Sequence, residues 1–263
     1  MGFEVAAEAY GRFMGRFSEP LAATFVDFAG IGSGRRVLDV GCGPGALTAE
    51  LIRRLGATER GDRPGGRWAV AGIDPSEAFV AASRVRFPGV DIRLGSAEDL
   101  PYGSDSFDCA LAQLVVHFMA DPVAGLREMA RVTRPGGTVA ACVWDHAGGR
   151  GPLSPFWRAV RDLDPGARDE SQLAGARQGE LGELLTVAGL GDVACAELTV
   201  TTRFAGFDEW WEPYTFGVGP AGDYVRGLDP ERREALRDRC ASAFGGREPF
   251  DVTAVAWAAA GRV

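Results

Sequence analysis

Val37-Leu38-Asp39-Val40-Gly41-Cys42-Gly43-Pro44-Gly45 is the stretch that decides the fold of this chain. Apolar residues surround one acid, and three alternating glycines follow directly. A buried strand that runs into a glycine loop is typical of a nucleotide site at the carboxyl edge of a parallel sheet, because glycine lets the backbone approach a ligand closely. A helical pattern follows at Leu47, Leu51, Ile52 and Leu55. Loop amides and a helix N-terminus are therefore expected to face the ligand.

Two nucleotide chemistries compete for this loop. Residues 41–46 fit the loose dinucleotide pattern G-x-G-x-x-G/A, a weak signal alone. The next expected strand, 68–73, ends in Asp74, which is placed to bind ribose hydroxyls. A dinucleotide fingerprint expects that acid roughly 20 residues after the first glycine, and here the separation is 33 residues. Asp39 would repel a pyrophosphate and suits the cationic amino end of S-adenosylmethionine, so the loop favours the latter over a nicotinamide cofactor.

Composition limits the classes of function. The 263 residues are 46% hydrophobic and carry a net charge of −8, which predicts one substantial core and argues against a broad nucleic-acid surface. All 28 basic residues are arginine, which excludes a Schiff-base or P-loop lysine. Five dispersed cysteines and two histidines form no zinc pattern, so no metal is expected. With no signal-peptide pattern and no long apolar run, we expect a cytoplasmic protein without a membrane span.

The chain alternates expected strands and helices from 35 to 144, which predicts a parallel sheet with right-handed crossovers. The expected strands are 36–40, 68–73, 90–94, 107–114 and 138–144. Asp121-Pro122 is a typical helix start, and residues 134–137 end that helix and turn into the last of these strands.

Past residue 145 the pattern changes. We expect helices near 155–163 and 179–188 and β-rich runs at 192–203 and 252–258. Residues 204–249, with an aromatic start and a charged helix near 229–243, are too long for a turn and predict an inserted helical cap. The expected organisation is a single domain over 1–263, made of N-terminal helices (1–34), a core (35–203 and 250–263) and the cap (204–249).

These motifs together carry a family resemblance. Segments 37–45, 72–76, 95–101, 105–108 and 126–137 occur in the order found in class I S-adenosylmethionine-dependent methyltransferases. The chain most resembles the branch related to ubiquinone- and menaquinone-biosynthesis methyltransferases, and residues 10–16 resemble that family's N-terminal segment. The resemblance implies a Rossmann-like α/β fold with a seven-stranded, mostly parallel sheet. Its last, antiparallel strand would be 252–258, paired beside 192–203.

The resemblance also implies S-adenosylmethionine as cofactor and a role for the glycine loop. Gly41, Gly43 and Gly45 would cradle the methionyl part, and Asp39 would orient its amino group. Asp74 would bind both ribose hydroxyls. A simpler alternative for Asp74 is a helix cap, because a helix is expected to begin at the next residue.

Further cofactor contacts follow from the same resemblance. Pro75 would be a further cofactor-binding residue, and Ser96, Ala97 and Glu98 would border the adenine. Family members often have aspartate at the position of Ser96, so the adenine amino contact is expected from Glu98 or to be weaker. Gln113, at the end of the fourth strand, would supply a carbonyl near the methionyl group or the sulfonium.

The basic and catalytic candidates lie on the substrate side of the sheet. His117 follows the fourth strand as a candidate general base, with a structural role in its loop as the alternative. His146 follows the fifth strand and is expected mainly to shape a loop or the substrate site. Arg16, ahead of Arg12, is a candidate for the methionyl carboxylate, although surface arginines are common. Tyr10, in the family-like N-terminal segment, is a substrate-site candidate.

Aromatic residues near the start of the cap allow two interpretations. Trp210, Trp211 and Tyr214 either wall an apolar acceptor pocket or form the core of the cap. The expected function is methyl transfer from S-adenosylmethionine to a small, partly apolar molecule. A catalytically silent S-adenosylmethionine sensor or scaffold and a nicotinamide oxidoreductase are the alternatives. A homodimer is an open arrangement, and the acceptor and the methylated atom stay undefined.

Overall fold

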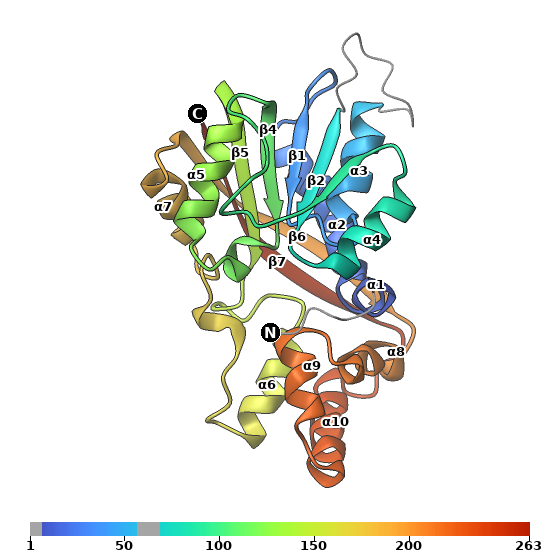
Figure 1. Cartoon of the computed structure of the whole chain (residues 1–263). Coiled ribbons are helices and arrows are strands. Elements are labelled where there is room, and N and C mark those ends of the chain that lie inside the picture. Colours follow the sequence, from blue (N-terminus) through green and yellow to red (C-terminus); the bar gives the residue numbers. More distant parts are fainter. Residues whose placement is uncertain (1–6, 57–68) are drawn as a thin grey trace.

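The computed structural model describes residues 7–56 and 69–263, and its centre is a seven-stranded sheet (Figure 1). The strand order is β3-β2-β1-β4-β5-β7-β6. Strands β1 to β5 pair in parallel, whereas β7 is antiparallel to both of its neighbours, β5 and β6. The strands are β1 (Val37–Val40), β2 (Val70–Asp74), β3 (Asp91–Leu94), β4 (Phe107–Gln113), β5 (Thr133–Trp144), β6 (Gly191–Phe204) and β7 (Phe250–Arg262). The predicted fold class is confirmed.

The predicted strands match these elements with small shifts at their ends. The largest is in β5, which begins at Thr133 rather than 138, because residues 134–137 continue its path after α5 (Pro122–Val132). The predicted start of α5 is confirmed, since Asp121 accepts a hydrogen bond from the Ala124 amide at 3.0 Å. Trp68, the expected first residue of the second strand, lies outside the described residues.

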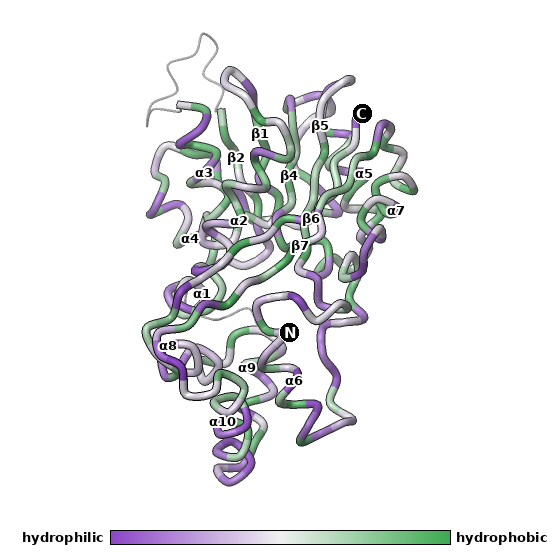
Figure 2. The backbone as a smooth tube through the Cα atoms, turned by 180° about the vertical axis from the view of Figure 1, so that it is seen from behind, coloured by the Kyte–Doolittle hydropathy of each residue, from purple (hydrophilic) through white to green (hydrophobic). Residues whose placement is uncertain are grey.

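Helices cover both faces of the sheet (Figures 1 and 2). One face carries α2 (Arg16–Phe28), α3 (Ala46–Leu55) and α4 (Glu77–Arg86), and the other carries α5 and α7 (Glu180–Val187). All four residues of β1 are buried, as expected for a parallel strand covered on both faces. The strand order turns back between β1 and β4, and ligands bind at such a switch point, outside the carboxyl ends of the strands.

The segment between β6 and β7 folds as a helical insertion, residues 205–249. It contains α8 (Phe207–Trp211), a 3-10 turn (Glu212–Phe216), α9 (Gly219–Arg226) and α10 (Pro230–Phe244). Its two ends meet, because Phe204 and Phe250 are partners across β6 and β7 and their rings stack at 5.7 Å. The helix α6 (Ser154–Leu163) packs beside α10 of this insertion (Figure 1). The predicted organisation places α6 in the core, 35–203.

The N-terminal segment joins the sheet to the insertion. It runs through α1 (Ala7–Tyr10) and a π-helical turn (Gly11–Gly15) into α2. Phe17 of α2, Trp144 of β5 and Trp210 of the insertion belong to one continuous apolar core. In the part of the chain that the structure describes, no helix has the length and apolar character needed to span a bilayer.

Candidate functional site

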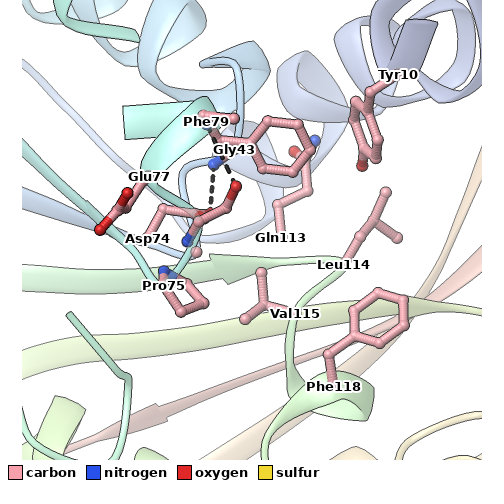
Figure 3. A pocket seen from close by; sticks show the side chains of 13 residues that line it. Tyr10, Gly43, Asp74, Pro75, Glu77, Phe79, Gln113, Leu114, Val115 and Phe118 are labelled. Atoms are coloured by element: carbon pink, nitrogen blue, oxygen red, sulfur yellow. Dashed lines mark hydrogen bonds between the residues drawn. The ribbon is translucent and has the colours of Figure 1, made fainter. Parts of the chain in front are cut away.

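A cavity of about 790 Å³ lies at the carboxyl ends of β1, β2 and β4, and we call it the large cavity. Figure 3 shows its lining, which comes from the glycine loop after β1, the turn between β2 and α4, the end of β4 and α1. Predicted site residues that line it are Tyr10, Gly41, Gly43, Asp74, Pro75 and Gln113. The topology therefore brings together residues from four separate segments, as expected for a ligand site at the switch point.

The three glycines of the loop all have positive φ, at +69° for Gly41, +52° for Gly43 and +92° for Gly45. A Cβ at Gly41 would lie 2.3 Å from Val115, and one at Gly45 would lie 2.2 Å from Phe87, so the fold itself requires these two glycines. A Cβ at Gly43 would meet no atom within 4 Å. Gly43 therefore faces open space in the large cavity, and this is the space that a ligand would use.

Asp74 ties the glycine loop to the second strand. Its Oδ2 accepts a hydrogen bond from the Gly43 amide at 2.9 Å (Figure 3). Its Oδ1 accepts one from the Ser76 amide at 2.8 Å. Burial raises the pKa of this carboxyl. The residue that caps α4 is Ser76, whose Oγ accepts from the Phe79 amide, so the helix-cap alternative for Asp74 is not what the structure shows. The carboxylate retains lone pairs that can accept ribose hydroxyls.

Asp39 lies in a small pocket of about 30 Å³ behind the glycine loop, which we call the deep pocket. Asp39 is 1% exposed and accepts a hydrogen bond from Thr48 Oγ1 at 2.6 Å. Burial raises its pKa to about 7. Ser18 Oγ and Gln113 Oε1 line the same pocket and, among the described residues, have no hydrogen-bond partner.

The deep pocket fits the amino end of a methionyl group. A buried acid that has no basic partner is costly, as are buried polar atoms without partners, and an ammonium group would satisfy both. Gln113 also donates from Nε2 to the Ser18 carbonyl at 2.9 Å, which directs its Oε1 away from that carbonyl. Ser18 and Thr48 were not predicted as site residues, because single hydroxyls inside helical patterns carry no sequence signal.

A second cavity of about 50 Å³ adjoins the large one and shares Tyr10, Leu114 and Phe118 with it. Leu114 has φ of +61°, which is unusual for a side chain of this size and is a strain found mainly at functional sites. The wall is mostly apolar, and its aliphatic and aromatic members include Phe13, Met14, Trp144, Leu153, Val218 and Pro220.

Four titratable side chains interrupt this apolar wall, namely Tyr10, His117, His146 and Glu170. Burial raises the pKa of Tyr10 to about 12, so its hydroxyl keeps its proton. The two imidazole rings lie 5.8 Å apart, and His146 Nδ1 is 3.9 Å from Glu170 Oε2. Glu170 accepts a hydrogen bond from Trp157 Nε1 at 2.8 Å. Burial lowers the pKa of both histidines, which keeps them neutral. Glu170 was not predicted as a site residue, because an acid outside any predicted strand or helix gives no signal.

The predicted adenine residues have other partners in the structure. Ser96 Oγ donates to the Glu98 carboxylate, and Glu98 Oε1 accepts from the Ala120 amide at 2.8 Å. Ala97 is buried against the apolar core beside α5. The described lining of the large cavity does not include these three residues, so their adenine role stays a prediction.

The side chain of Arg16 has partners in the insertion and in β6. Its guanidinium lies 2.8 Å from Glu209 Oε1, donates to the Arg203 carbonyl at 2.8 Å and covers the Phe204 ring. Arg12 likewise pairs with Glu212 at 2.6 Å. Both arginines hold the N-terminal segment to the insertion, and the contact of Arg16 with a methionyl carboxylate stays a prediction.

The aromatic residues of the insertion form its interior. Trp210, Trp211 and Tyr214 are between 2% and 6% exposed. Their partners are other aromatics, with Trp210 4.9 Å from Phe244 and Tyr214 stacked at 4.5 Å on Phe156. The described lining of the second cavity takes residues 218–221 from the insertion instead. The structure therefore favours the core interpretation of the three aromatics over the wall interpretation.

Comparison with known proteins supports the resemblance found in the sequence. Residues 38–141 match the family model of the methyltransferase domain. The chain is 41% identical to the methyltransferase GfsG of Streptomyces halstedii over 114 residues, 42% of this chain and 38% of that protein. It is 40% identical to a demethylmenaquinone methyltransferase of Mycobacterium sp. (strain KMS) over 113 residues, 43% of each chain. The match thus spans less than half the length of these relatives.

Solved structures share the fold over nearly the whole chain. A phosphoethanolamine N-methyltransferase of Haemonchus contortus, in complex with phosphomonomethylethanolamine and S-adenosylhomocysteine, aligns with a TM-score of 0.57 and 16% identity, over 97% of this chain and 56% of that one. The [4+2]-cyclase SpnF aligns with a TM-score of 0.52 and 20% identity, over 93% of this chain and 80% of that one. Likeness at this level of identity shows the fold alone, and activity must be argued from the site.

Proposed function

We propose that this protein transfers a methyl group from S-adenosylmethionine to a small, partly apolar molecule. The observation that carries the proposal is the convergence of Asp39, Ser18 Oγ and Gln113 Oε1 behind a glycine, Gly43, whose missing Cβ leaves open space. A cationic amino group can donate hydrogen bonds to these buried acceptors, whereas a pyrophosphate is itself negatively charged and would be repelled by Asp39. The methyltransferase-domain match and the solved relative that holds S-adenosylhomocysteine support the same cofactor.

The chain's own residues would position the two reactants. S-adenosylmethionine, when bound, supplies an activated methyl group, so the protein needs mainly to align the acceptor and exclude water. Asp74 and Gly43 would hold the ribose end, and Asp39 the amino end. Tyr10 and Leu114 lie where the large and second cavities meet, and there they would face the reacting groups.

Calorimetry tests the cofactor directly. We expect S-adenosylhomocysteine to bind with one site per chain and NAD to give little or no heat. Tight binding of NAD without any signal from S-adenosylhomocysteine would overturn the proposal. Transfer of a labelled methyl group to a metabolite extract separates an enzyme from a silent sensor.

Three further expectations accompany this function. We propose a cytoplasmic location, a small-molecule acceptor rather than a nucleic acid, and a homodimer as the state to test. Native mass spectrometry measures the oligomeric state, and a mobility-shift assay with RNA and DNA measures nucleic-acid binding. The net charge of −8 argues for a negative result in the second assay.

A further inference from the structure

The second cavity brings together three side chains from distant parts of the sequence. His117 comes from the 3-10 turn Val116–Phe118, His146 from the turn after β5, and Glu170 from the 3-10 turn Glu170–Gln172. Two ring nitrogens, His117 Nδ1 and His146 Nε2, are buried and have no partner among the described residues. Buried polar atoms are costly unless a partner satisfies them, so this end of the cavity favours a ligand group that can donate a hydrogen bond.

The two histidines differ in what surrounds them. Glu170 faces His146 Nδ1 at 3.9 Å, and the carboxylates of Glu170, Asp169 and Asp145 all oppose the effect of burial on the pKa of His146. For His117 the influences are burial and His146 itself, and both lower its pKa. A proton that arrives in this cavity is therefore better tolerated on His146 than on His117, because among the described residues the carboxylates influence His146 and not His117.

Glu170 also favours one tautomer of His146, through its charge and not through a hydrogen bond, because 3.9 Å is too long for one. A carboxylate near Nδ1 favours the ring form with its proton on Nδ1, and this form leaves a lone pair on Nε2. Nε2 is the atom without a partner. The Trp157 indole holds Glu170 Oε2 at 2.8 Å, so the carboxylate has a fixed position behind the ring. The arrangement is that of an imidazole base oriented by an acid.

We propose that His146 is the proton acceptor of the methyl transfer, that Glu170 is its positioning residue, and that the methyl acceptor is a phenol-type hydroxyl. This inference rests on the proposed function and deepens it. His117, which the sequence ranks first as a base, would carry its proton on Nδ1 and donate a second hydrogen bond to the oxygen of the same hydroxyl.

The reaction balances with these groups. The hydroxyl oxygen forms a bond to the methyl carbon as the carbon–sulfur bond breaks, and the electron pair of that bond stays on sulfur in neutral S-adenosylhomocysteine. The proton of the hydroxyl passes to Nε2 of His146, giving an imidazolium beside Glu170. Solvent then removes that proton when the product leaves.

The wall and the base together define the acceptor class. A neutral amine attacks with its own lone pair before it loses a proton, so it has little need of this base, whereas a hydroxyl has to be deprotonated as it reacts. A phenol, with a pKa near 10, is closer to imidazole in acidity than an alkyl alcohol is. The rings of Phe13, Phe118 and Trp144 line the cavity, and such walls suit a flat apolar body.

Nuclear magnetic resonance of the histidine rings tests the assignment without turnover. The chain has only two histidines, so ring nitrogen–proton correlation spectra contain two spin systems, and His117→Asn identifies which is which. We expect His146 to carry its proton on Nδ1, with Nε2 bare. Glu170→Gln should lower the pKa of His146 by about one unit and leave that of His117 nearly unchanged.

Asp169→Asn is the matched control, because Asp169 adjoins Glu170 in sequence but is paired with Arg161 at 2.6 Å. It should move the His146 pKa less than Glu170→Gln does. The positioning role of Glu170 would be overturned by a proton on Nε2 of His146, or by a His146 pKa that stays unchanged in Glu170→Gln.

Turnover with graded phenols tests the base and the acceptor class. At pH 8, labelled methyl transfer is measured with phenol, with 4-nitrophenol, which is already ionised, and with aniline. We expect His146→Asn to lower kcat on phenol by about 100-fold with little change in KM, and to lower kcat on 4-nitrophenol by less than about tenfold. Glu170→Gln should lower kcat on phenol by about tenfold, and aniline should be a poor acceptor.

Equal losses of His146→Asn on both phenols would overturn the role of His146 as base. If the wild-type protein methylates aniline and ignores phenols, or methylates no phenol while it binds S-adenosylhomocysteine, the hydroxyl acceptor class is wrong and the proposed cofactor stands. Failure to bind S-adenosylhomocysteine would instead remove the proposed function itself.

Discussion

The large cavity and the second cavity are neighbours in space but differ in how the chain builds them. Much of the lining of the large cavity comes from short contiguous motifs, above all the loop 41–45 and Asp74. Backbone groups take part directly, since the Gly43 amide binds the Asp74 carboxylate. The second cavity collects single side chains from the N-terminal segment, β5, residue 170 and the start of α9. A site built from contiguous motifs can be recognised in the sequence by the spacing of its residues, whereas a site built from dispersed side chains cannot.

This contrast separates what a shared cofactor demands from what an acceptor demands. A backbone cradle depends on positive φ values and on a strand-to-loop order, and both can be preserved while side chains change. An acceptor wall depends on which side chains the loops and the insertion present. Three substitutions and one pH titration test the contrast.

Trp210→Ala should cost about 3–5 kcal/mol of unfolding free energy, because Trp210 is buried among Tyr214, Phe244 and Phe207. Urea unfolding measures the loss, and the affinity of the folded protein for S-adenosylhomocysteine should stay within about twofold. Trp210→Phe, which retains most of the volume, should lose less. Unchanged stability combined with lost acceptor turnover would instead support the interpretation in which Trp210 walls the acceptor pocket.

Gly43→Val should weaken binding of S-adenosylhomocysteine by at least about 100-fold, because its side chain would fill the open space beside the loop. Gly30→Val is the matched control. Gly30 also has positive φ, +64°, with no atom near its absent Cβ, but it follows α2 outside the cavity. Both variants place a β-branched residue at a positive φ, so their backbone strain is comparable. Normal binding of S-adenosylhomocysteine by a folded Gly43→Val protein would contradict a role for the glycine loop in holding the ligand.

Asp74→Ala should lower cofactor affinity at least tenfold, since charge-assisted hydrogen bonds contribute about 1.5–3 kcal/mol each. The same change removes the acceptor of the Gly43 and Ser76 amides, so a stability loss of about 1–3 kcal/mol should accompany it. Asp121→Ala loses a comparable bond to the Ala124 amide and should leave the affinity intact. Calorimetry and thermal unfolding on both variants separate the two effects.

Lowering the pH from 7.5 to 6 should weaken S-adenosylhomocysteine binding by about five- to tenfold, because burial raises the pKa of Asp39 to about 7 and the ammonium requires the carboxylate. The Asp39→Asn variant should bind S-adenosylhomocysteine weakly, and its affinity should not change with pH over this range. In the ligand-free protein the folded-state pKa lies above the ordinary value of 3.8, so the stability that this group contributes is present below pH 4 and is lost as the pH rises to about 7. A flat affinity over this range would place the amino group elsewhere.

The sequence predicted the sheet and the glycine-loop half of the site because both depend on local order. The apolar run around Asp39 and the one that ends at Asp74, each followed by turn residues, indicate two strands and the edge at which they end. The sequence does not tell which neighbour a helical side chain meets. Arg16 lies on a predicted helix, yet Glu209 in the insertion captures it.

The acceptor side shows the same limit from another direction. The aromatic spacing at Trp210, Trp211 and Tyr214 indicates burial but not whether the buried face meets a ligand or other helices. In the structure α6 supplies Phe156 as the partner of Tyr214, a pairing across 58 positions in the sequence. The orientation of His146 likewise depends on Glu170, and their proximity follows from tertiary packing alone.

The junction of the insertion with the sheet has a consequence for evolution and engineering. Since Phe204 and Phe250 are direct partners, the chain leaves and re-enters the sheet at one point, and the register of β6 and β7 does not depend on the length of what lies between. Segments inserted at such closely spaced ends can be lengthened, shortened or exchanged between relatives without re-pairing the strands. A chimera that exchanges residues 205–249 would also have to keep Glu209 and Glu212, because these carboxylates pair with Arg16 and Arg12 of the N-terminal segment.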